Sequence, residues 1–326
     1  MGAPEVVAAL LGASRITTIC HENPDADTLG AATALRLVAE RLGKSAEVVS
    51  GDPVPPFLSF MPRVAEVRRA PGLEPDLAVI VDGPLERTGS VARDAGAWLA
   101  QATIVNIDHH VSNTRDDALT LVDPSAAATC EMVALLLPEL GVELDAELAT
   151  ALLGGIVQDT HTFVHPNATP RTLRVAASLV EAGADLHAIN RALYADKPYA
   201  TLALWGRMLA GMGERAEGRI VHASMTLAML EATGAAPTAS EGFVDLLGIT
   251  RDAMINVLFK EQPGTEVRVS VRTVEPADAV AITSAFGGGG HARAAGCTVH
   301  APIDEARARV LAACERELER VHAGRR

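Results

Sequence analysis

The amino-acid sequence predicts an α/β fold, with an N-terminal doubly wound, mainly parallel sheet and a smaller C-terminal α/β domain with a mixed sheet. Apolar runs alternate with helical patterns through the first half of the chain, which is typical of a parallel sheet. Two runs, DLAVIVD (76–82) and ATIVNID (102–108), are apolar without interruption, as in strands covered on both faces. A chain of 326 residues, 48% of them hydrophobic, is long enough to bury two cores.

The elements of the first domain are predicted in order from local patterns. Runs of β-branched and other apolar residues predict strands at 15–20, 45–50, 76–82, 102–108 and 119–123. Apolar residues at helical spacing predict helices over 27–42, 126–137 and 146–157, the last one reaching Asp159. These elements place the end of the first domain near residue 185.

A second sheet is predicted in the last third of the chain. Helical patterns at 169–182, 186–193 and 198–212 form the connection to it. From Arg219 onward, RIVHASM, AMINVLF and EVRVSVRT predict strands, and helices are expected over 277–286 and 304–321. We therefore expect a first domain over 1–185, a helical linker over 186–215 and a second domain over 216–326.

Charge and composition exclude several classes of protein. The net charge of −13 argues against a surface that coats duplex nucleic acid, because such a surface needs broad positive potential. No apolar run approaches the roughly 18–20 residues that span a bilayer, and no export signal is visible. Cys20, Cys130, Cys297 and Cys314 form no C-x-x-C pair, which suits reduced thiols. We expect a cytoplasmic protein that binds no membrane.

Acidic and imidazole side chains follow the apolar runs of the first domain. HENPDAD follows the first strand, AVIVDGP and VNIDHH end the third and fourth, and GGIVQDT ends a helix. Ligands of open parallel sheets lie beyond the carboxyl ends of the strands, so these segments are expected to meet at one edge. The residues concerned are His21, Asp25, Asp27, Asp82, Asp108, His109, His110 and Asp159.

Carboxylates crowded at one edge repel each other, so either their pKa values rise strongly or cations neutralise them. Two divalent ions would resolve the conflict, and mixed carboxylate and imidazole donors suit Mn²⁺ or a related metal. Taken singly, each aspartate could instead cap a helix or stabilise a turn, and each histidine could be structural. Four such clusters follow four successive elements of the first domain, and this coincidence favours a metal site over separate structural roles.

Four motifs in the first domain resemble those of the DHH phosphoesterase superfamily. They are HENPDADTLG, VDGPLERTG, NIDHHVSNT and GGIVQDT, in this order. In the second domain, FGGGGHARAAG (286–296) resembles the glycine-rich motif of the DHH-associated domain. The resemblance covers nearly the whole chain. In its short length and its lack of extra domains, the chain is most similar to one subgroup. This subgroup comprises bifunctional oligoribonucleases (nano-RNases) and 3′-phosphoadenosine-5′-phosphate (PAP) phosphatases.

The resemblance implies a dinuclear metal centre in a catalytic DHH domain. One ion would be bound by His21, Asp25 and Asp82, and the other by Asp27, Asp82, His109 and Asp159, with Asp82 as the bridge. Asp108 would orient a histidine ligand through its free ring nitrogen, and His110 would face the scissile phosphate. The two ions are expected to be Mn²⁺, with Mg²⁺ or Co²⁺ as alternatives.

The second domain is expected, from the same resemblance, to select the substrate, with the active site in the cleft between the domains. The domain contains a glycine run, which comprises Gly287, Gly288, Gly289 and Gly290. Because glycine lacks a Cβ atom, the amides of this run could form an anion-binding nest. Such a run also makes an ordinary turn. His291 could add a charged donor. Arg272 is the candidate for a phosphate or base contact, and Arg251 is a second cation nearby in sequence. The spacing between metals and nest would then limit the substrate to a few nucleotides.

Two positions depart from the usual motifs of the superfamily. Ala31 stands where family members often have Ser, and His161 stands where they often have Gly. We interpret Ala31 as a change in packing. His161 follows the last motif aspartate by two residues, and no role is predicted for it.

The resemblance implies an enzyme that hydrolyses very short oligoribonucleotides, pApA among them, to mononucleotides and that also converts PAP to AMP. The alternatives are a RecJ-type single-strand DNA exonuclease and a soluble cyclic di-AMP or pApA phosphodiesterase. A non-catalytic nucleotide sensor would be expected to have lost a metal ligand, whereas every ligand position here holds a competent residue. Short RNA and nucleotides are the expected partners, without stable duplex binding, and the chain is expected to form a homodimer.

Overall fold

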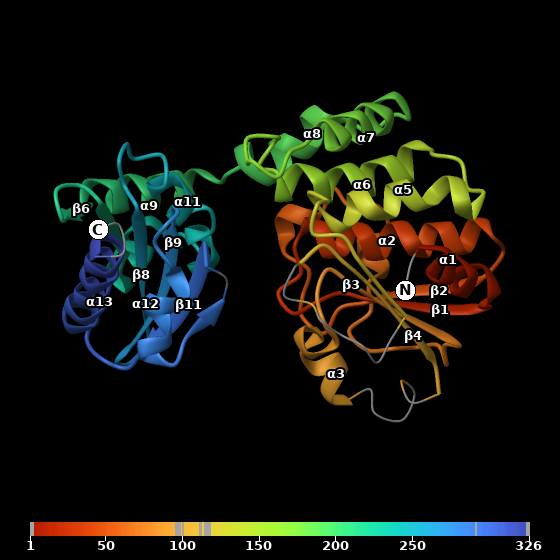
Figure 1. Cartoon of the computed structure of the whole chain (residues 1–326). Coiled ribbons are helices and arrows are strands. Elements are labelled where there is room, and N and C mark those ends of the chain that lie inside the picture. The colour runs from red at the N-terminus through yellow and green to blue at the C-terminus, as the bar shows by residue number, and fades with distance from the viewer. Residues whose placement is uncertain are drawn as a thin grey trace. The chain divides into compact units, whose positions relative to one another are not determined.

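The computed structural model describes residues 3–94, 99, 101–110, 113, 119–290 and 292–323. The chain divides into two compact units, Met1–Asp196 and Lys197–Arg326, and each has its own sheet and core. Figure 1 shows both units as sheets with helices packed against them. Among the helices of the described residues, none has both the length and the hydropathy needed to cross a bilayer.

The first unit is built on a parallel sheet that has five strands in the described part of the chain. They are β1 (Arg15–Ile19), β2 (Ser45–Val49), β3 (Leu77–Val81), β4 (Thr103–Asp108) and β5 (Leu119–Val122), in the spatial order β2-β1-β3-β4-β5. The chain runs outward from β1 to β2 and then returns to β3 on the other side of β1. The carboxyl ends of β1 and β3 therefore form the topological switch point, where such sheets bind ligands. The predicted parallel sheet is confirmed.

Helices cover one face of this sheet in successive layers (Figure 1). The layer on the strands holds α1 (Ala3–Gly12) and α2 (Ala26–Arg41), and the next holds α5 (Thr129–Leu140) and α6 (Ala146–Asp159). The outer layer consists of α7 (Pro170–Glu181) and α8 (Leu186–Asn190). The short helix α3 (Ser90–Asp94) lies on the opposite face, where Val91 packs against Ile80. Because α2 lies between the strands and α6, nearly all of its residues are buried.

Small residues allow α2 to approach α5 and α6 closely. A Cβ atom at Gly30 would lie 2.4 Å from the carbonyl oxygen of Ala151 on α6. A Cβ atom at Gly155 would lie 2.4 Å from Cys130 Sγ and 2.5 Å from Asp27 Oδ1. The second glycine of the GGIVQDT motif is therefore needed for space, because a side chain there would displace the carboxylate of Asp27.

The second unit contains a mixed sheet of six strands among the described residues, as predicted. The strands are β6 (Gly213–Arg215), β7 (Ile220–Met225), β8 (Ile255–Gln262), β9 (Glu266–Thr273), β10 (Gly289–Gly290) and β11 (Ala294–Val299), in the order β10-β11-β9-β8-β7-β6. Only the pair of β7 and β8 is parallel. One face packs on α12 (Ala279–Thr283) and α13 (Ile303–Ala323), and the other packs on α9 (Tyr199–Ala210), α10 (Leu227–Thr233) and α11 (Phe243–Leu247).

Some local expectations differ from the structure. The helix expected over 126–137 begins at Thr129 and continues through Pro138 to Leu140. The helix expected over 277–286 is one turn, Ala279–Thr283, followed by a 3₁₀ turn over Ser284–Phe286. The helix expected over 186–193 becomes a π turn at Arg191–Ala195. The start of α12 is set locally, because Asp278 accepts hydrogen bonds from the amides of Val280 and Ala281.

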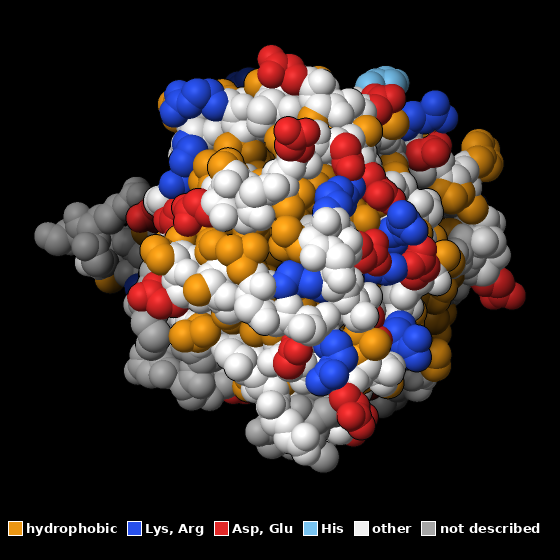
Figure 2. Space-filling model, turned by 90° about the vertical axis from the view of Figure 1, so that its right-hand side faces the viewer, with side chains coloured by type: hydrophobic (Ala, Val, Ile, Leu, Met, Phe, Trp, Pro, Cys, Tyr) orange, Lys and Arg blue, Asp and Glu red, His pale blue; other side chains and the backbone are white. Residues whose placement is uncertain are grey.

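Charges of both signs are mixed on the molecular face seen in Figure 2. Basic and acidic side chains alternate there, and exposed apolar side chains lie between them. This face therefore lacks the broad positive potential that duplex nucleic acid requires.

Candidate metal centre

Asp82 stands at the carboxyl end of β3, at the topological switch point. Its φ of +61° is unusual for a residue with a side chain, and its N–H donates to the carbonyl of Ile107 at 3.0 Å, which holds the turn. The side chain is almost completely buried. Its Oδ2 lies 3.2 Å from His21 Nε2, and its Oδ1 lies 3.4 Å from His109 Nε2. Each oxygen of Asp82 therefore faces a different histidine.

His21 and Asp25 lie on one side of Asp82. The Nδ1 of His21 lies 2.8 Å from the carbonyl of Glu22, so this nitrogen carries the proton and leaves Nε2 as the possible ligand atom. Nε2 is 3.7 Å from Asp25 Oδ1. That same oxygen accepts hydrogen bonds from the amides of Asp27 and Thr28, so Asp25 is also the N-cap of α2. The capping role and the ligand position belong to one side chain.

Asp27 is completely buried in the first turn of α2. Its two oxygens accept hydrogen bonds from the start of α5, at 2.7 Å from the amide of Thr129 and at 2.9 Å from that of Cys130. These bonds explain why α5 begins at Thr129. They also fix the carboxylate beside His109 and Asp159, with which it forms a group able to hold a metal ion.

His109 and Asp159 complete the other side of the cluster. His109 Nε2 lies 3.2 Å from Asp159 Oδ2, and its Nδ1 lies 3.3 Å from the carbonyl of Ala126. Nε2 is buried and has no well-directed hydrogen bond, although carboxylate oxygens of Asp159 and Asp82 surround it. A buried ring nitrogen among carboxylate oxygens can hold either a proton or a metal ion, so this donor set fits a divalent cation.

Asp108 lies against His110. The Nδ1 of His110 is 2.7 Å from Asp108 Oδ1, and the amide of His110 donates to the same oxygen. Asp108 therefore contacts His110 and not the expected ligand His109, whose Nδ1 faces the carbonyl of Ala126. Consecutive residues after a strand point to opposite sides, and so only one of the two imidazoles reaches Asp108.

Two side chains that sequence reasoning missed support these residues. Asn113 donates to Asp108 Oδ2 at 2.8 Å, and Thr129 Oγ1 donates to Asp82 Oδ1 at 3.1 Å. Asn113 belongs to the NIDHHVSNT motif, so the sequence offered a signal for it. Thr129 stands in a segment without any motif, and only the packing of α5 brings it to Asp82.

Charges within the cluster compensate each other unevenly. Burial would lower the pKa of His21 and His109, but Asp25 and Asp82 raise that of His21 to about 10, and Asp159 and Asp82 raise that of His109 to about 12. Burial would raise the pKa of Asp82, but His109 and His21 hold it well below its usual range. Protons on both histidines thus balance the carboxylates, and a divalent cation would replace these protons.

The remaining carboxyl groups are less well compensated. Burial, together with Asp82 and Asp159, raises the pKa of Asp27 well above its usual range, whereas its two N–H donors act in the opposite direction. Burial also raises the pKa of Asp159 to about 6, despite the imidazole of His109 at 3.2 Å. Both groups favour an added positive charge. The predicted clustering of carboxylates is therefore present, and the cluster can hold metal.

The ligand sets expected from the sequence correspond to groups that the structure brings together. The described side chains able to share a cation are His21, Asp25 and Asp82 in one group, Asp27, His109 and Asp159 in another, and Asp82, His109 and His110 in a third. Asp82 belongs to two of these groups. The assignment of each ligand to one ion stays a prediction.

The candidate substrate residues of the second unit have partners of their own. Arg272 Nε lies 2.9 Å from Asp245 Oδ1, so this guanidinium is paired within the unit. In the glycine run, the amides of Gly287 and Gly288 donate to the carbonyls of Ser284 and Thr283. Gly289 and Gly290 form β10, which pairs with β11, so few amides of the run remain for an anion nest. His291 lies outside the described residues.

Close packing on β11 explains part of the glycine run. A Cβ at Gly288 would lie 2.3 Å from the carbonyl oxygen of Gly296, and one at Gly290 would lie 2.6 Å from that of Ala294. Gly287 also has a φ of +70°, at the end of the 3₁₀ turn. These three positions need glycine for the fold, whatever the segment binds.

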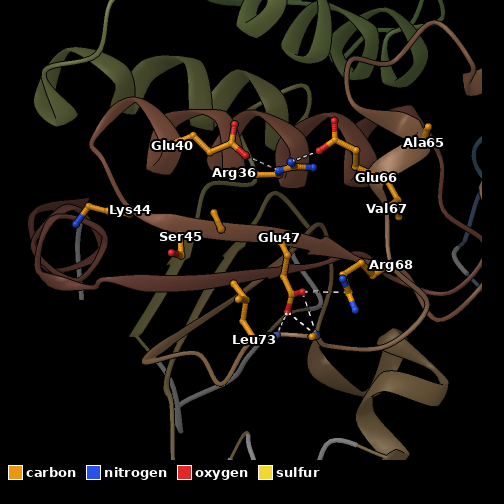
Figure 3. Close-up of a pocket in the computed structure, with 12 residues that line it drawn as sticks. Arg36, Glu40, Lys44, Ser45, Glu47, Ala65, Glu66, Val67, Arg68 and Leu73 are labelled. Carbon is orange, nitrogen blue, oxygen red and sulfur yellow. Dashed lines mark hydrogen bonds and ion pairs between the residues drawn. The ribbon is translucent and has the colours of Figure 1, made fainter.

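An open cavity of about 690 Å³ lies beside the edge strand β2 (Figure 3), and none of the candidate metal ligands lines it. Its charged side chains already have partners, and Lys44 donates to the carbonyls of Leu11 and Ala13. Arg36 binds Glu40 and Glu66, and Glu47 accepts from the amides of Gly72 and Leu73 and pairs with Arg68. These contacts attach the segment after β2 to the sheet, and the cavity adds nothing to the cluster.

Substitution of Asp27 and of Asp159 should have different effects on the stability of the metal-free protein. Asp27→Ala leaves two buried amides without an acceptor and should lower the free energy of unfolding by about 2 kcal/mol or more. Asp159→Ala removes a carboxylate that faces His109 rather than an amide, and should cost much less. Urea unfolding in the presence of a chelator measures both. Equal losses would contradict the capping role of Asp27.

Comparison with known proteins identifies the families that both units match and relatives that align along nearly the whole chain. Residues 15–156 match the N-terminal domain of the DHH family, and residues 220–320 match the DHHA1 domain. A bifunctional oligoribonuclease and PAP phosphatase NrnA of Thermus thermophilus is 36% identical over 97% of this chain and 93% of its own length. The NrnA of Bacillus subtilis is 27% identical over 90% of this chain and 92% of its own length.

A solved structure shares the fold. An exopolyphosphatase-related protein from Bacteroides fragilis superposes with a TM-score of 0.88 at 22% identity, covering 98% of this chain and 95% of that one. The order of the motifs, the parallel sheet that carries them and the full-length similarity lead to one conclusion. The chain belongs to the DHH family, with a DHH domain followed by a DHHA1 domain.

Proposed function

We propose that this chain is a metal-dependent phosphoesterase that hydrolyses very short oligoribonucleotides to mononucleotides and converts PAP to AMP. The observation that carries the proposal is the full-length similarity to the NrnA of Thermus thermophilus, which is named for both activities. The buried cluster of aspartates and histidines supports it, because phosphoester hydrolysis at neutral pH needs an activated water and compensation of phosphate charge.

The proposal includes two divalent ions, Mn²⁺ before Mg²⁺ or Co²⁺. His21, Asp25 and Asp82 would hold one of them, and Asp27, Asp82, His109 and Asp159 would hold the other. When bound, the ions supply Lewis acidity that activates water and neutralises charge on the phosphate. The two oxygens of Asp82, each facing a different histidine, support a bridging role.

His110 is proposed to contact the scissile phosphate. The bond from its Nδ1 to Asp108 fixes the ring, so Nε2 is the nitrogen that can reach a substrate. Asn113 in turn holds Asp108 through its second oxygen. Asp108 is therefore proposed as a positioning residue, which keeps the tautomer and direction of His110 constant.

The second unit is proposed to select the substrate. Arg272 can contribute if an incoming phosphate competes with Asp245 for its guanidinium. The domain bounds 1–185, 186–215 and 216–326, the homodimer and the cytoplasmic location also stay predictions.

A panel of substrates tests the function. With Mn²⁺, we expect turnover of pApA, of two- to five-nucleotide RNA and of PAP, and little turnover of long single-stranded DNA, cyclic di-AMP or pyrophosphate. For long strands the acidic net charge of −13 is the physical reason, because each added phosphate meets an unfavourable potential. Preference for long strands would favour a RecJ-type exonuclease, and preference for cyclic di-AMP would favour a cyclic dinucleotide phosphodiesterase.

Asp82→Ala should remove more activity than Asp25→Ala. Loss of the carboxylate that faces both histidines disrupts both proposed ion sites, whereas loss of Asp25 affects one. Calorimetric titration with Mn²⁺ should show that Asp25→Ala retains one ion and that Asp82→Ala retains neither. If both variants bind two ions and have equal residual turnover, Asp82 is not a bridge.

His110→Ala should separate chemistry from metal binding. We expect unchanged Mn²⁺ content and a fall in kcat of roughly 10²-fold, the scale of losing one donor to a developing charge. His187→Ala, at an exposed histidine on α8, is the matched control and should change neither quantity. Joint loss of metal and activity would instead make His110 a ligand, as its grouping with Asp82 and His109 permits.

A further inference from the structure

The turn that follows α6 has an unusual backbone. His161, Thr162 and Phe163 have φ values of +47°, +56° and +64°, and none of them is glycine. Three successive left-handed residues with side chains cost roughly 1 kcal/mol or more each. The turn is held by bonds to Thr160, whose carbonyl accepts from the amides of Val164 and His165, both at 2.9 Å. The chain thus maintains a costly conformation directly after Asp159.

This turn brings three rings together at the end of α6. The rings of His161 and His165 are nearly parallel, at 16°, with centroids 5.3 Å apart. The ring of Tyr194 meets His161 edge-on at 4.6 Å. Both histidines are exposed, whereas Tyr194 is half-buried in the π turn after α8. We refer to His161, His165 and Tyr194 as the ring cluster.

The ring cluster is fixed to the end of α6, which carries Asp159. The hydroxyl of Tyr194 donates to the carbonyls of Val157 and Gln158, both at 3.2 Å. The Nδ1 of His165 lies 3.3 Å from the carbonyl of Asp159. The rings are therefore anchored to the backbone that positions a candidate ligand.

The fold alone does not account for these rings. The two exposed histidines bury little apolar surface, so their packing does not offset the strain of the turn. Neither histidine belongs to a described group able to hold a metal ion. What a stacked pair of exposed imidazoles does offer is a flat aromatic outer face, on which a nucleobase of any kind can stack.

We propose that His161 and His165 form a stacking platform for the nucleobase of a nucleotide whose phosphate lies at the metal centre. This inference rests on the proposed function and extends it by assigning base recognition to the first unit. A nucleotide carries its base and its phosphate on one ribose. A base attached to a phosphate near Asp159 therefore lies within reach of side chains two and six residues further along the same turn. Recognition by stacking would make hydrolysis tolerant of base identity.

Binding of AMP and of ribose 5-phosphate in the presence of Mn²⁺ tests the platform without using turnover. We expect the protein to bind AMP about tenfold more tightly or better, because stacking contributes roughly 1–3 kcal/mol per base. His161→Ala and His165→Ala should each reduce this ratio toward one by weakening AMP alone. His161→Phe keeps a flat ring and should retain the ratio. His187→Ala is the control and should bind both ligands as the unsubstituted protein does.

Several outcomes would overturn the platform. Equal affinity of the unsubstituted protein for the two ligands would exclude base stacking. Parallel weakening of both ligands by His161→Ala would indicate a phosphate contact or a displaced Asp159, and the Mn²⁺ content of the variant identifies the second case. Failure of His161→Phe to keep the ratio would point to a hydrogen bond instead of stacking. A protein that shows the expected ratios but hydrolyses no short RNA would support the platform and contradict the proposed function.

Discussion

The burial of several carboxylates at one edge of a parallel sheet is the constraint on which the first unit depends. Asp82 lies at the point where the strand order reverses, and its oxygens face His21 on one side and His109 on the other. Repulsion among the carboxylates is expensive in a buried site, so the protein requires positive charge there. Protons on the two histidines supply it in the absence of a metal, and a cation can displace them.

The packing of α2 makes this arrangement possible. Glycine at positions 30 and 155 lets α6 approach closely, and the first turn of α2 then lies between the sheet edge and the start of α5. Asp25 caps α2 itself, whereas Asp27 accepts from the first amides of α5. An aspartate of this cluster can therefore cap a helix and also be a candidate metal ligand. Hydrogen bonds from the amides orient the same carboxylates that can bind the cation.

In the second unit, two strands depend on backbone pairing instead of on a pattern of side chains. These strands, β10 and β11, are rich in glycine and alanine. β11 pairs with β9 along six residues, and β10 pairs with β11. Neither strand has the β-branched pattern that marks the central ones, so sequence reasoning missed both. The glycine run, interpreted as an anion nest, is also explained by the close approach of β11, and two of its amides already have acceptors.

The sequence by itself determined the two-sheet α/β architecture, the strands of the first sheet and the aspartates and histidines that gather at its edge. These follow from uninterrupted apolar runs and from the rule that ligands gather at the carboxyl ends of parallel strands. Tertiary structure alone decided which residue pairs with which. The start of α5 depends on Asp27, Asp108 meets His110 because adjacent side chains diverge, and His161 meets Tyr194 across more than thirty residues. Such contacts depend on directions in space, which a one-dimensional pattern does not contain.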